Sequence, residues 1–184
     1  MDQFLLSLKL KLQHLGAVRP EAWDMLSSLI KIVRVKPEKH FVREVGNIFY
    51  VADGLMKECD LQARSEASII NFLGNGQCSF CFTNTQRLFV AAILPSTLFS
   101  LDLMELYELH QAYTELAHIY RFLRFEYHER LLLRIQLLEM VPRKRIIQFC
   151  DSHRLLLPYL KKKDMANYLH LDYDYFVRTY RKLQ

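Results

Sequence analysis

Residues 161–184 read KKKDMANYLHLDYDYFVRTYRKLQ, a pattern that predicts two short helices joined by a tight turn near His170. A helix-turn-helix needs a small residue where its second helix crosses the first, and Ala166 supplies one. The apolar side chains at its core positions would be Met165, Leu169, Leu171 and Phe176. The stretch therefore fits a helix-turn-helix.

His170 occupies the turn position that usually carries glycine. Histidine is one of the non-glycine residues that tolerate a left-handed backbone, so its expected cost in the turn is moderate. Asp172 is expected to cap the second helix, and Asp174 in the first turn complements the helix dipole.

The second helix would expose side chains suited to base edges and phosphates. These are Tyr173, Asp174, Val177, Arg178, Arg181 and Lys182. The pattern alone leaves a second interpretation open, an ordinary helical hairpin with a solvated basic face.

The net charge of +5 is distributed unevenly along the chain. Residues 1–141 carry 15 Lys and Arg against 16 Asp and Glu, a net charge of −1. Residues 142–184 carry 10 Lys and Arg against four Asp, a net charge of +6. This asymmetry indicates that the last quarter of the chain meets a polyanion.

The preceding residues divide into three compositional regions. Residues 2–30 have a helical pattern that breaks at Gly16 and restarts at Pro20. Residues 31–101 hold short β-branched and aromatic runs separated by turn signals, such as Asp53-Gly54, and predict an antiparallel sandwich or roll. Residues 102–141 contain neither Gly nor Pro, and one helix over residues 103–138 would be roughly 54 Å long.

An apolar seam recurs at alternating steps of three and four residues in that helix. Its members are Leu106, Leu109, Tyr113, Leu116, Tyr120, Leu123 and Tyr127. One interpretation is a seam shared by two chains, with Ile119, Phe122 and Phe125 packing on the roll of their own chain. The other is a core helix lying across the roll, and both can apply along different stretches.

Composition excludes several classes of protein. A chain of 184 residues that is 51% hydrophobic, with five Gly and five Pro, is neither disordered nor collagenous. Its four cysteines suit a reducing cytoplasm, and no apolar run approaches the roughly 18–20 residues that span a bilayer. We therefore expect a cytoplasmic α+β protein without membrane contact.

The order of these parts resembles the Crp/Fnr family of bacterial transcription regulators. NIFYVADGLMKECD (residues 47–60) resembles the strand–Gly–strand hairpin of the family's roll, and DMANYLHLDYDYFVRTYRKL (residues 164–183) resembles its recognition unit. Arg145 sits where such relatives carry an Arg-Tyr pair. The resemblance implies an α+β fold, with N-terminal helices and an antiparallel, cyclic-nucleotide-binding-domain-like jelly roll (1–101), a long dimerisation helix (102–141) and a helix-turn-helix domain (142–184).

The resemblance implies a homodimer on double-stranded DNA, with RNA polymerase as a further candidate partner. The base-reading positions would fall on Tyr173, Asp174 and Arg178. Phosphate contacts are expected from Arg143, Lys161, Lys162, Lys163, Arg181 and Lys182. Tyr173 replaces a more usual Arg, and Val177 a more usual Ser or Gly, so the preferred half-site should differ. The sequence stops at Gln184, so we expect no complete β wing.

The resemblance places a candidate effector pocket at Gly74, Asn75 and Arg87. Family members that bind cyclic nucleotides use a Gly-Glu pair followed by an Arg-Ser or Arg-Thr pair. Asn75 stands where Glu is needed, and Leu88 removes the hydroxyl partner. A buried phosphate would lack hydrogen-bond partners here, so we expect no cyclic nucleotide and no other cofactor. The roll is expected to bind another small effector of unknown identity, or no effector.

Metal and enzyme sites find little support in the sequence. Cys78 and Cys81 have C-x-x-C spacing but no second pair, so they are expected to be buried thiols. A metal-dependent enzyme on a roll needs a His-x-His pair, yet the strand region has only His40. We therefore expect no metal and no enzyme. The alternative function is a β-roll regulatory protein that has lost specific DNA binding and acts through protein or small-ligand contacts.

Overall fold

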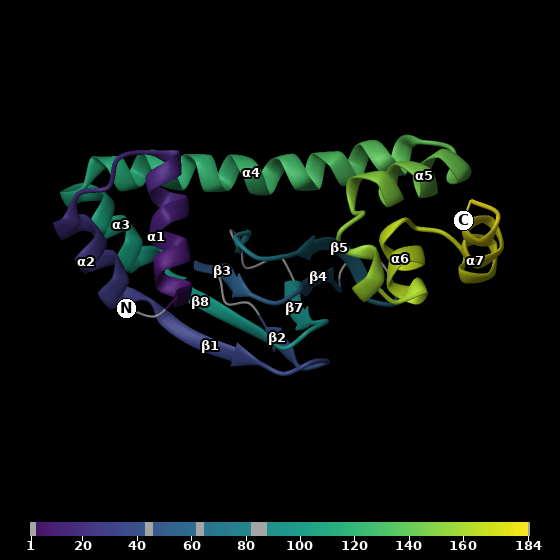
Figure 1. Ribbon diagram of the computed structural model, residues 1–184, viewed down its shortest axis with the longest axis horizontal. Coiled ribbons are helices and arrows are strands. Elements are labelled where there is room, and N and C mark those ends of the chain that lie inside the picture. Colours follow the sequence, from purple (N-terminus) through teal and green to yellow (C-terminus); the bar gives the residue numbers. More distant parts are fainter. Residues whose placement is uncertain (1–2, 43–45, 62–64, 82–87, 184) are drawn as a thin grey trace.

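The computed structural model describes residues 3–42, 46–61, 65–81 and 88–183, and Figure 1 shows their arrangement. Two antiparallel four-stranded sheets form a roll, with strand orders β1-β8-β3-β6 and β2-β7-β4-β5. The strands are β1 (Lys31–Val35), β2 (His40–Val42), β3 (Asn47–Asp53), β4 (Met56–Asp60), β5 (Ser68–Leu73), β6 (Cys78–Phe80), β7 (Leu88–Ala92) and β8 (Ser96–Asp102). The predicted antiparallel roll is confirmed.

Strand β3 is buried on both faces, which explains its nearly continuous apolar sequence. Phe49 and Val51 point into the core between the two sheets. Ile48 and Tyr50 point to the other face, where helices cover the sheet. The roll is therefore a middle layer between its own interior and a helical layer.

The helical layer consists of α1 (Gln3–Leu15), α2 (Pro20–Leu29), α3 (Leu103–Ala112) and α4 (Thr114–Glu139). The break at Gly16 and the restart at Pro20 agree with the prediction. Leu8, Trp23 and Leu116 are buried in the core that these helices share with the first sheet. None of the helices in the described ranges is long and apolar enough to cross a membrane.

The prediction of a single helix over residues 103–138 is wrong, because the helix is interrupted at Tyr113. Its backbone there has φ −133° and ψ 88°, and a new helix starts at Thr114. The break lets α3 pack on β8 and α2 while α4 runs along the length of the molecule (Figure 1). Arg19 lies beside the break, where it pairs with Glu115 at 2.8 Å and lies over the Tyr113 ring.

The C-terminal region contains α5 (Pro142–Ser152), a 3-10 turn (Leu157–Tyr159), α6 (Lys162–Tyr168) and α7 (Tyr173–Arg181). It has no separate core. Phe149, Met165 and Phe176 share one buried cluster with Ile69 and Phe72 of β5. The helix-turn-helix is therefore packed onto the second sheet of the roll.

Gly54 turns the chain between β3 and β4 with φ +104°, as the Asp53-Gly54 pattern predicts. A Cβ atom there would lie 2.6 Å from the Pro95 carbonyl oxygen and 2.7 Å from the Ser96 Cα. Gly54→Ala should therefore lower the free energy of unfolding by about 2–4 kcal/mol, from left-handed strain and overpacking.

Chemical denaturation of Gly54→Ala beside Gly16→Ala checks this expectation. A Cβ atom at Gly16 would meet only Ile119, at an ordinary 3.5 Å, so that variant should stay close to wild type. Equal effects of the two substitutions would show that the β3–β4 turn is not constrained in this way.

Candidate nucleic-acid interface

The turn between α6 and α7 has the conformation that the sequence predicts. His170 adopts φ 52°, in the left-handed region. The Leu171 amide donates to the Ala166 carbonyl oxygen at 3.0 Å and closes the end of α6. Asp172 caps α7, its Oδ1 accepting from the Tyr175 amide at 2.9 Å. The turn thus fixes the direction in which α7 leaves α6.

Helix α7 presents one face to the core and the other to solvent. Phe176 is fully buried and Tyr180 is 9% exposed, and their rings stack with centroids 5.4 Å apart. On the α6 side, Met165, Ala166 and Leu169 are buried as expected, while Leu171 is partly buried. This packing prevents α7 from rotating and determines which residues face outward.

The three predicted base-reading residues all lie on the solvent face of α7. Tyr173 is 49% exposed, and Asp174 and Arg178 are exposed as well. Arg178 Nε donates to the Asp174 carbonyl oxygen at 3.3 Å, which leaves the two terminal nitrogens of the guanidinium facing solvent. Val177 is partly buried, so it takes part in packing as well as in the surface. The role of Tyr173, Asp174 and Arg178 in base reading remains a prediction.

Five of the six predicted phosphate-binding residues are exposed without an ion pair among the described residues. They are Arg143, Lys162, Lys163, Arg181 and Lys182. Lys161 differs, since its Nζ pairs with Glu38 Oε1 of the roll at 2.7 Å. That pair lowers the pKa of the Glu38 carboxyl and raises the pKa of the Lys161 ammonium. Both side chains are largely exposed, so the pair stabilises the fold only slightly.

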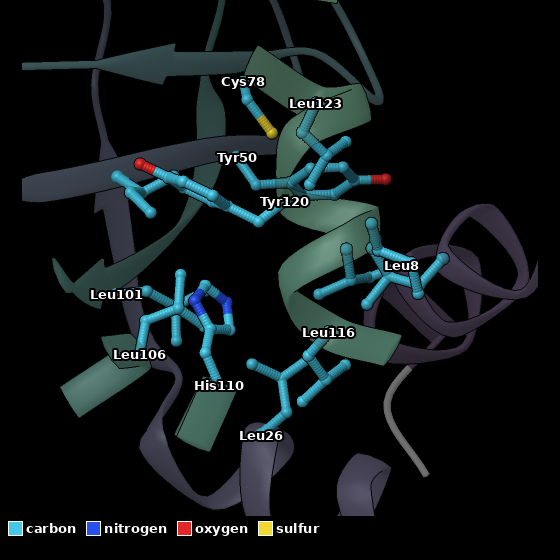
Figure 2. Close-up of a pocket in the computed structure, with 13 residues that line it drawn as sticks. Leu8, Leu26, Tyr50, Cys78, Leu101, Leu106, His110, Leu116, Tyr120 and Leu123 are labelled. Atoms are coloured by element: carbon cyan, nitrogen blue, oxygen red, sulfur yellow. The ribbon is translucent and has the colours of Figure 1, made fainter. Parts of the chain in front are cut away.

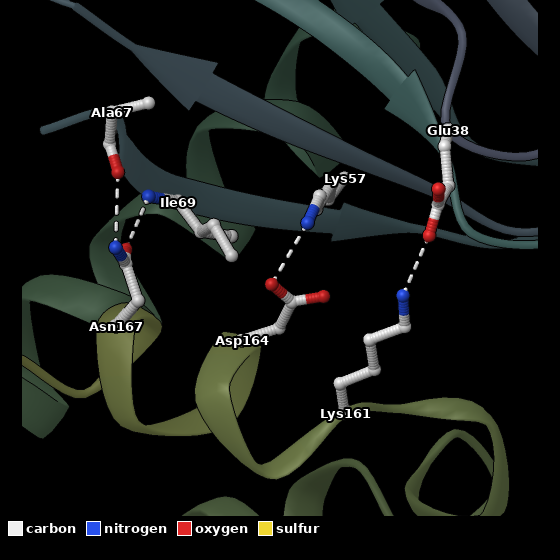
Figure 3. A network of polar contacts seen from close by, with 7 residues as sticks. All are labelled: Glu38, Lys57, Ala67, Ile69, Lys161, Asp164 and Asn167. Atoms are coloured by element: carbon white, nitrogen blue, oxygen red, sulfur yellow. Dashed lines mark hydrogen bonds and ion pairs between the residues drawn. The ribbon is translucent and has the colours of Figure 1, made fainter. Parts of the chain in front are cut away.

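Helix α6 is held on the edge of the second sheet by polar side chains (Figure 3). β5 is an edge strand, with backbone groups that no neighbouring strand pairs. Asn167 satisfies two of them, accepting from the Ile69 amide at 2.8 Å and donating to the Ala67 carbonyl oxygen at 2.9 Å. Lys57 and Asp164 form a second link at 2.8 Å.

Two arginines join the helix-turn-helix to the rest of the chain. Arg134 of α4 is 9% exposed and lies 2.8 Å from the His170 Nε2, which also contacts Ser68 Oγ. Arg145 donates to the Leu169 carbonyl oxygen, closing the end of α6. It also donates to two carbonyl oxygens at the end of α4, those of Leu138 and Met140. The orientation of α7 therefore depends on contacts to α4 and to the roll.

The residues of the predicted seam pack inside their own chain. Four of them are buried, Leu106, Leu109, Leu116 and Tyr127, and the remaining three, Tyr113, Tyr120 and Leu123, pack partly buried against the same core. This placement agrees with the interpretation of a core helix on the roll. The role of these seam residues in a dimer remains a prediction.

The expectation that Phe122 and Phe125 pack on the roll is wrong. Ile119 is buried as expected, whereas Phe122 is 42% and Phe125 61% exposed. At 100° per residue, both phenylalanines fall on the side of α4 opposite Leu116 and Tyr127. Helix α4 therefore carries an apolar face that its own roll does not cover.

Figure 2 shows a small cavity where α1, α2, α3 and α4 meet the first sheet. Its volume is about 50 Å³, and its wall is formed mainly by leucines, with Tyr50, Cys78 and His110. His110 Nε2 has no hydrogen-bond partner among the described residues, and burial lowers the pKa of its imidazole. A cavity of this size is far below the roughly 300–1,000 Å³ of small-molecule sites.

The structure places two of the three residues of the candidate effector pocket. Gly74 and Asn75 lie in the tight turn between β5 and β6, where the Gly74 amide donates to Gln77 Oε1 at 2.9 Å. Arg87 lies outside the described residues. Asn75 is exposed in this turn, and the candidate effector pocket as a whole remains a prediction.

The roll contains a buried carboxylate that the sequence did not indicate. Glu58 on β4 is 0% exposed. It accepts hydrogen bonds from Ser79 Oγ on β6 and the Tyr127 hydroxyl on α4, both at 3.0 Å, and from Asn71 Nδ2 on β5 at 3.5 Å. A glutamate in a strand of mixed polarity gives no sign of burial, and its partners are distant in sequence. This network ties α4 to the roll.

The cysteines of the C-x-x-C pattern are buried thiols, as expected. Burial raises the pKa of Cys78 to about 12, so its thiol stays protonated at neutral pH. Within the ranges that the structure describes, no group of three His, Cys, Asp or Glu residues is arranged to hold a metal ion.

Comparison with solved structures identifies the fold. FixK2 from Bradyrhizobium japonicum superposes with a TM-score of 0.71 at 16% identity, covering 84% of this chain and 84% of its own. A protein from Eubacterium rectale, described as a transcriptional regulator of the Crp/Fnr family, has a TM-score of 0.72 at 12% identity, with 91% and 84% covered. The regulator CLP from Xanthomonas campestris has a TM-score of 0.70 at 13% identity, with 90% and 92% covered.

These likenesses show that the chain has the fold of the Crp/Fnr transcriptional regulators over most of its length. The resemblance noted in the sequence is confirmed at the level of the fold. No protein-family model and no curated protein matches the sequence.

Removing the Asn167 side chain should free the edge of β5. Asn167→Ala deletes two hydrogen bonds, each contributing about 1 kcal/mol net, so the Ile69 amide should exchange with solvent about 30-fold faster. Hydrogen exchange followed by NMR measures this, with the exposed Asn75→Ala as the matched control. Unchanged protection at Ile69 would show that Asn167 does not hold α6 on the sheet.

Proposed function

We propose that this chain is a transcription regulator that binds specific sequences of double-stranded DNA as a homodimer, in the cytoplasm and without catalysing a reaction. The observation that carries the proposal is the two-sided packing of α7. Phe176 and Tyr180 lock one face in a core, while Tyr173, Asp174 and Arg178 project from the other. A rigid helix with a polar outer face is suited to the major groove.

The outward side chains match the hydrogen-bonding pattern of base edges. The terminal nitrogens of Arg178 can donate to O6 and N7 of guanine, and Asp174 can accept from N4 of cytosine. Each such contact contributes about 1–3 kcal/mol of discrimination. Around them, Lys162, Lys163 and Lys182 offer exposed ammonium groups for phosphates, which set affinity rather than sequence preference.

The dimer that we propose uses the uncovered face of α4. His118, Phe122, Phe125 and Leu132 follow one another at steps of four, three and seven residues, which keeps them on one side of the helix. Phe122, Phe125 and Leu132 are 42%, 61% and 46% exposed. Pairing two copies here would bury this stripe and place the two α7 helices about a two-fold axis, with half-sites roughly 34 Å apart.

We further propose that the roll does not bind a cyclic nucleotide in the manner of such domains. Asn75 stands where such domains carry a glutamate, and Leu88 stands where they carry a hydroxyl residue. A cyclic phosphate and its ribose would therefore lack two of their polar partners.

A second candidate function is a roll protein that acts through protein or small-ligand contacts without specific DNA binding. The docked position of α6 favours it, because Lys161 and Asp164 are engaged with Glu38 and Lys57 of the roll. Selection of bound sequences from random duplex DNA with the purified protein separates the two functions. Enrichment of a two-fold motif supports the regulator, and no enrichment at low salt supports the second candidate.

Arg178→Ala should reduce binding to the selected sequence by tenfold or more while changing binding to unrelated DNA little, because it removes a base contact of about 1–3 kcal/mol. Arg181→Ala, one helical turn further on, should weaken binding to all sequences equally, as the loss of a phosphate contact does. Fluorescence anisotropy at fixed salt measures both. An equal loss on all sequences for Arg178→Ala would contradict base reading.

Phe125→Glu should convert the dimer to a monomer. Burying the glutamate in the interface should cost about 1.4 kcal/mol per chain. Because a two-fold axis places the substitution in the interface twice, the dissociation constant of the dimer should rise about a hundredfold. Light scattering during size-exclusion chromatography measures the mass, and Met104→Glu, at a 68% exposed position on α3, is the control. A Phe125→Glu protein that remains dimeric would show that this face of α4 is not the dimer interface.

A further inference from the structure

A large pocket lies where α4, the β5–β6 turn and the segment after α5 meet. Its volume is about 610 Å³, within the roughly 300–1,000 Å³ range of small-molecule sites. We call it the junction pocket, and its defining residues are Asn75, Arg130, Leu133, Arg154, Leu155 and Tyr168. It is separate from the DNA-facing surface of α7, none of whose residues line it.

Arg130 of α4 supplies an incompletely satisfied cation to this pocket. Its Nη2 donates to the Cys78 carbonyl oxygen at 2.7 Å, but its buried Nε has no hydrogen-bond partner among the described residues. Burial lowers the pKa of the guanidinium, although the charges of Glu126 and Glu58 nearby oppose that shift. A buried donor without an acceptor is costly, and an anionic ligand would relieve that cost.

The opposite wall adds a second cation. Arg154, in the turn after α5, is exposed, and Asp151 beside it is the acidic residue of the described lining. Burial lowers the pKa of His153, so its imidazole is neutral at pH 7. Two guanidinium groups against one carboxylate leave the described wall with a net positive charge.

The rest of the described wall mixes amide and hydroxyl side chains with apolar and aromatic ones. The His153 ring stacks on Phe149 with centroids 4.5 Å apart and meets the edge of Phe72. At the rim, Leu133 is 54% and Leu155 86% exposed. Exposed leucines on both sides of a cavity leave apolar surface in water, which an occupant with an apolar body would cover.

We propose that the junction pocket binds a small organic anion with a flat, apolar body, whose charged group contacts Arg130 and Arg154 and whose body covers Leu133 and Leu155. Such a ligand would touch α4, the roll and the segment that leads to the helix-turn-helix at the same time. The site does not depend on DNA binding by α7, so a failure of one proposal does not contradict the other.

Two fluorescent probes test the site in the full-length protein. 8-Anilinonaphthalene-1-sulfonate carries the expected anion on a flat aromatic body, and N-phenyl-1-naphthylamine has the same rings without the sulfonate. We expect saturable binding of the sulfonate near one molecule per chain, tighter than that of the neutral probe. Arg130→Gln should lower the affinity for the sulfonate about tenfold, because one charge-assisted hydrogen bond is lost, and should leave the affinity for the neutral probe unchanged.

Matched variants make the result specific to the pocket. Arg121→Gln lies on α4 away from the pocket and should bind the sulfonate as wild type does. Phe125→Glu should also leave binding unchanged, which excludes the apolar face of α4 as the site. If Arg130→Gln does not fold, Arg154→Gln and Leu155→Glu, both at exposed positions, should each weaken the sulfonate.

Three outcomes would overturn the proposal. One is equal affinity of the sulfonate and the neutral probe for the wild-type protein. Another is unchanged sulfonate affinity in the folded pocket variants. The last is loss of probe binding in Phe125→Glu alone, which would place the probe on α4.

Discussion

The amide of Ile69 and the carbonyl oxygen of Ala67 lie at the open edge of a sheet, and Asn167 supplies a partner to both. An edge strand must have its backbone groups paired or hydrated, and here a single side chain of α6 takes the place of a neighbouring strand. Because α6 is fixed on this edge, the turn at His170 and the direction of α7 are fixed with it. The surface that we assign to DNA is thus positioned by the roll.

The buried Glu58 performs a comparable task on β4, the strand next to β5. A carboxylate without water needs several donors, and these come from β5, β6 and α4. Its hydrogen bond to Tyr127 brings α4 close to the roll, which buries the apolar seam of that helix in its own chain. The opposite face, with Phe122 and Phe125, is left in solvent. This buried hydrogen-bond network therefore helps to decide which side of α4 is available to a second copy.

Local chemistry made the helix-turn-helix predictable, and long-range packing made other features unpredictable. The left-handed turn at His170 and the cap at Asp172 depend on residues within a few positions, so a pattern in the sequence reveals them. The break at Tyr113 has no Gly or Pro, and it accompanies the packing of α3 on strand β8 and on α2, which is distant in sequence. Likewise, a polar residue such as Asn167 on a short helix looks like a solvent-facing one until the edge strand is seen beside it.

The ion pair between Lys161 and Glu38 has a consequence for how salt acts on the proposed complex with DNA. A free lysine that neutralises a phosphate releases one counterion, and affinity then falls as salt rises. Lys161 must first leave Glu38, whose carboxylate then attracts a cation from solution. Cation uptake at Glu38 therefore offsets part of the cation release at the phosphate. Lys161 can thus contribute a phosphate contact while adding less to the salt dependence than a free lysine does, so counting basic residues on this surface overstates the number of ions exchanged.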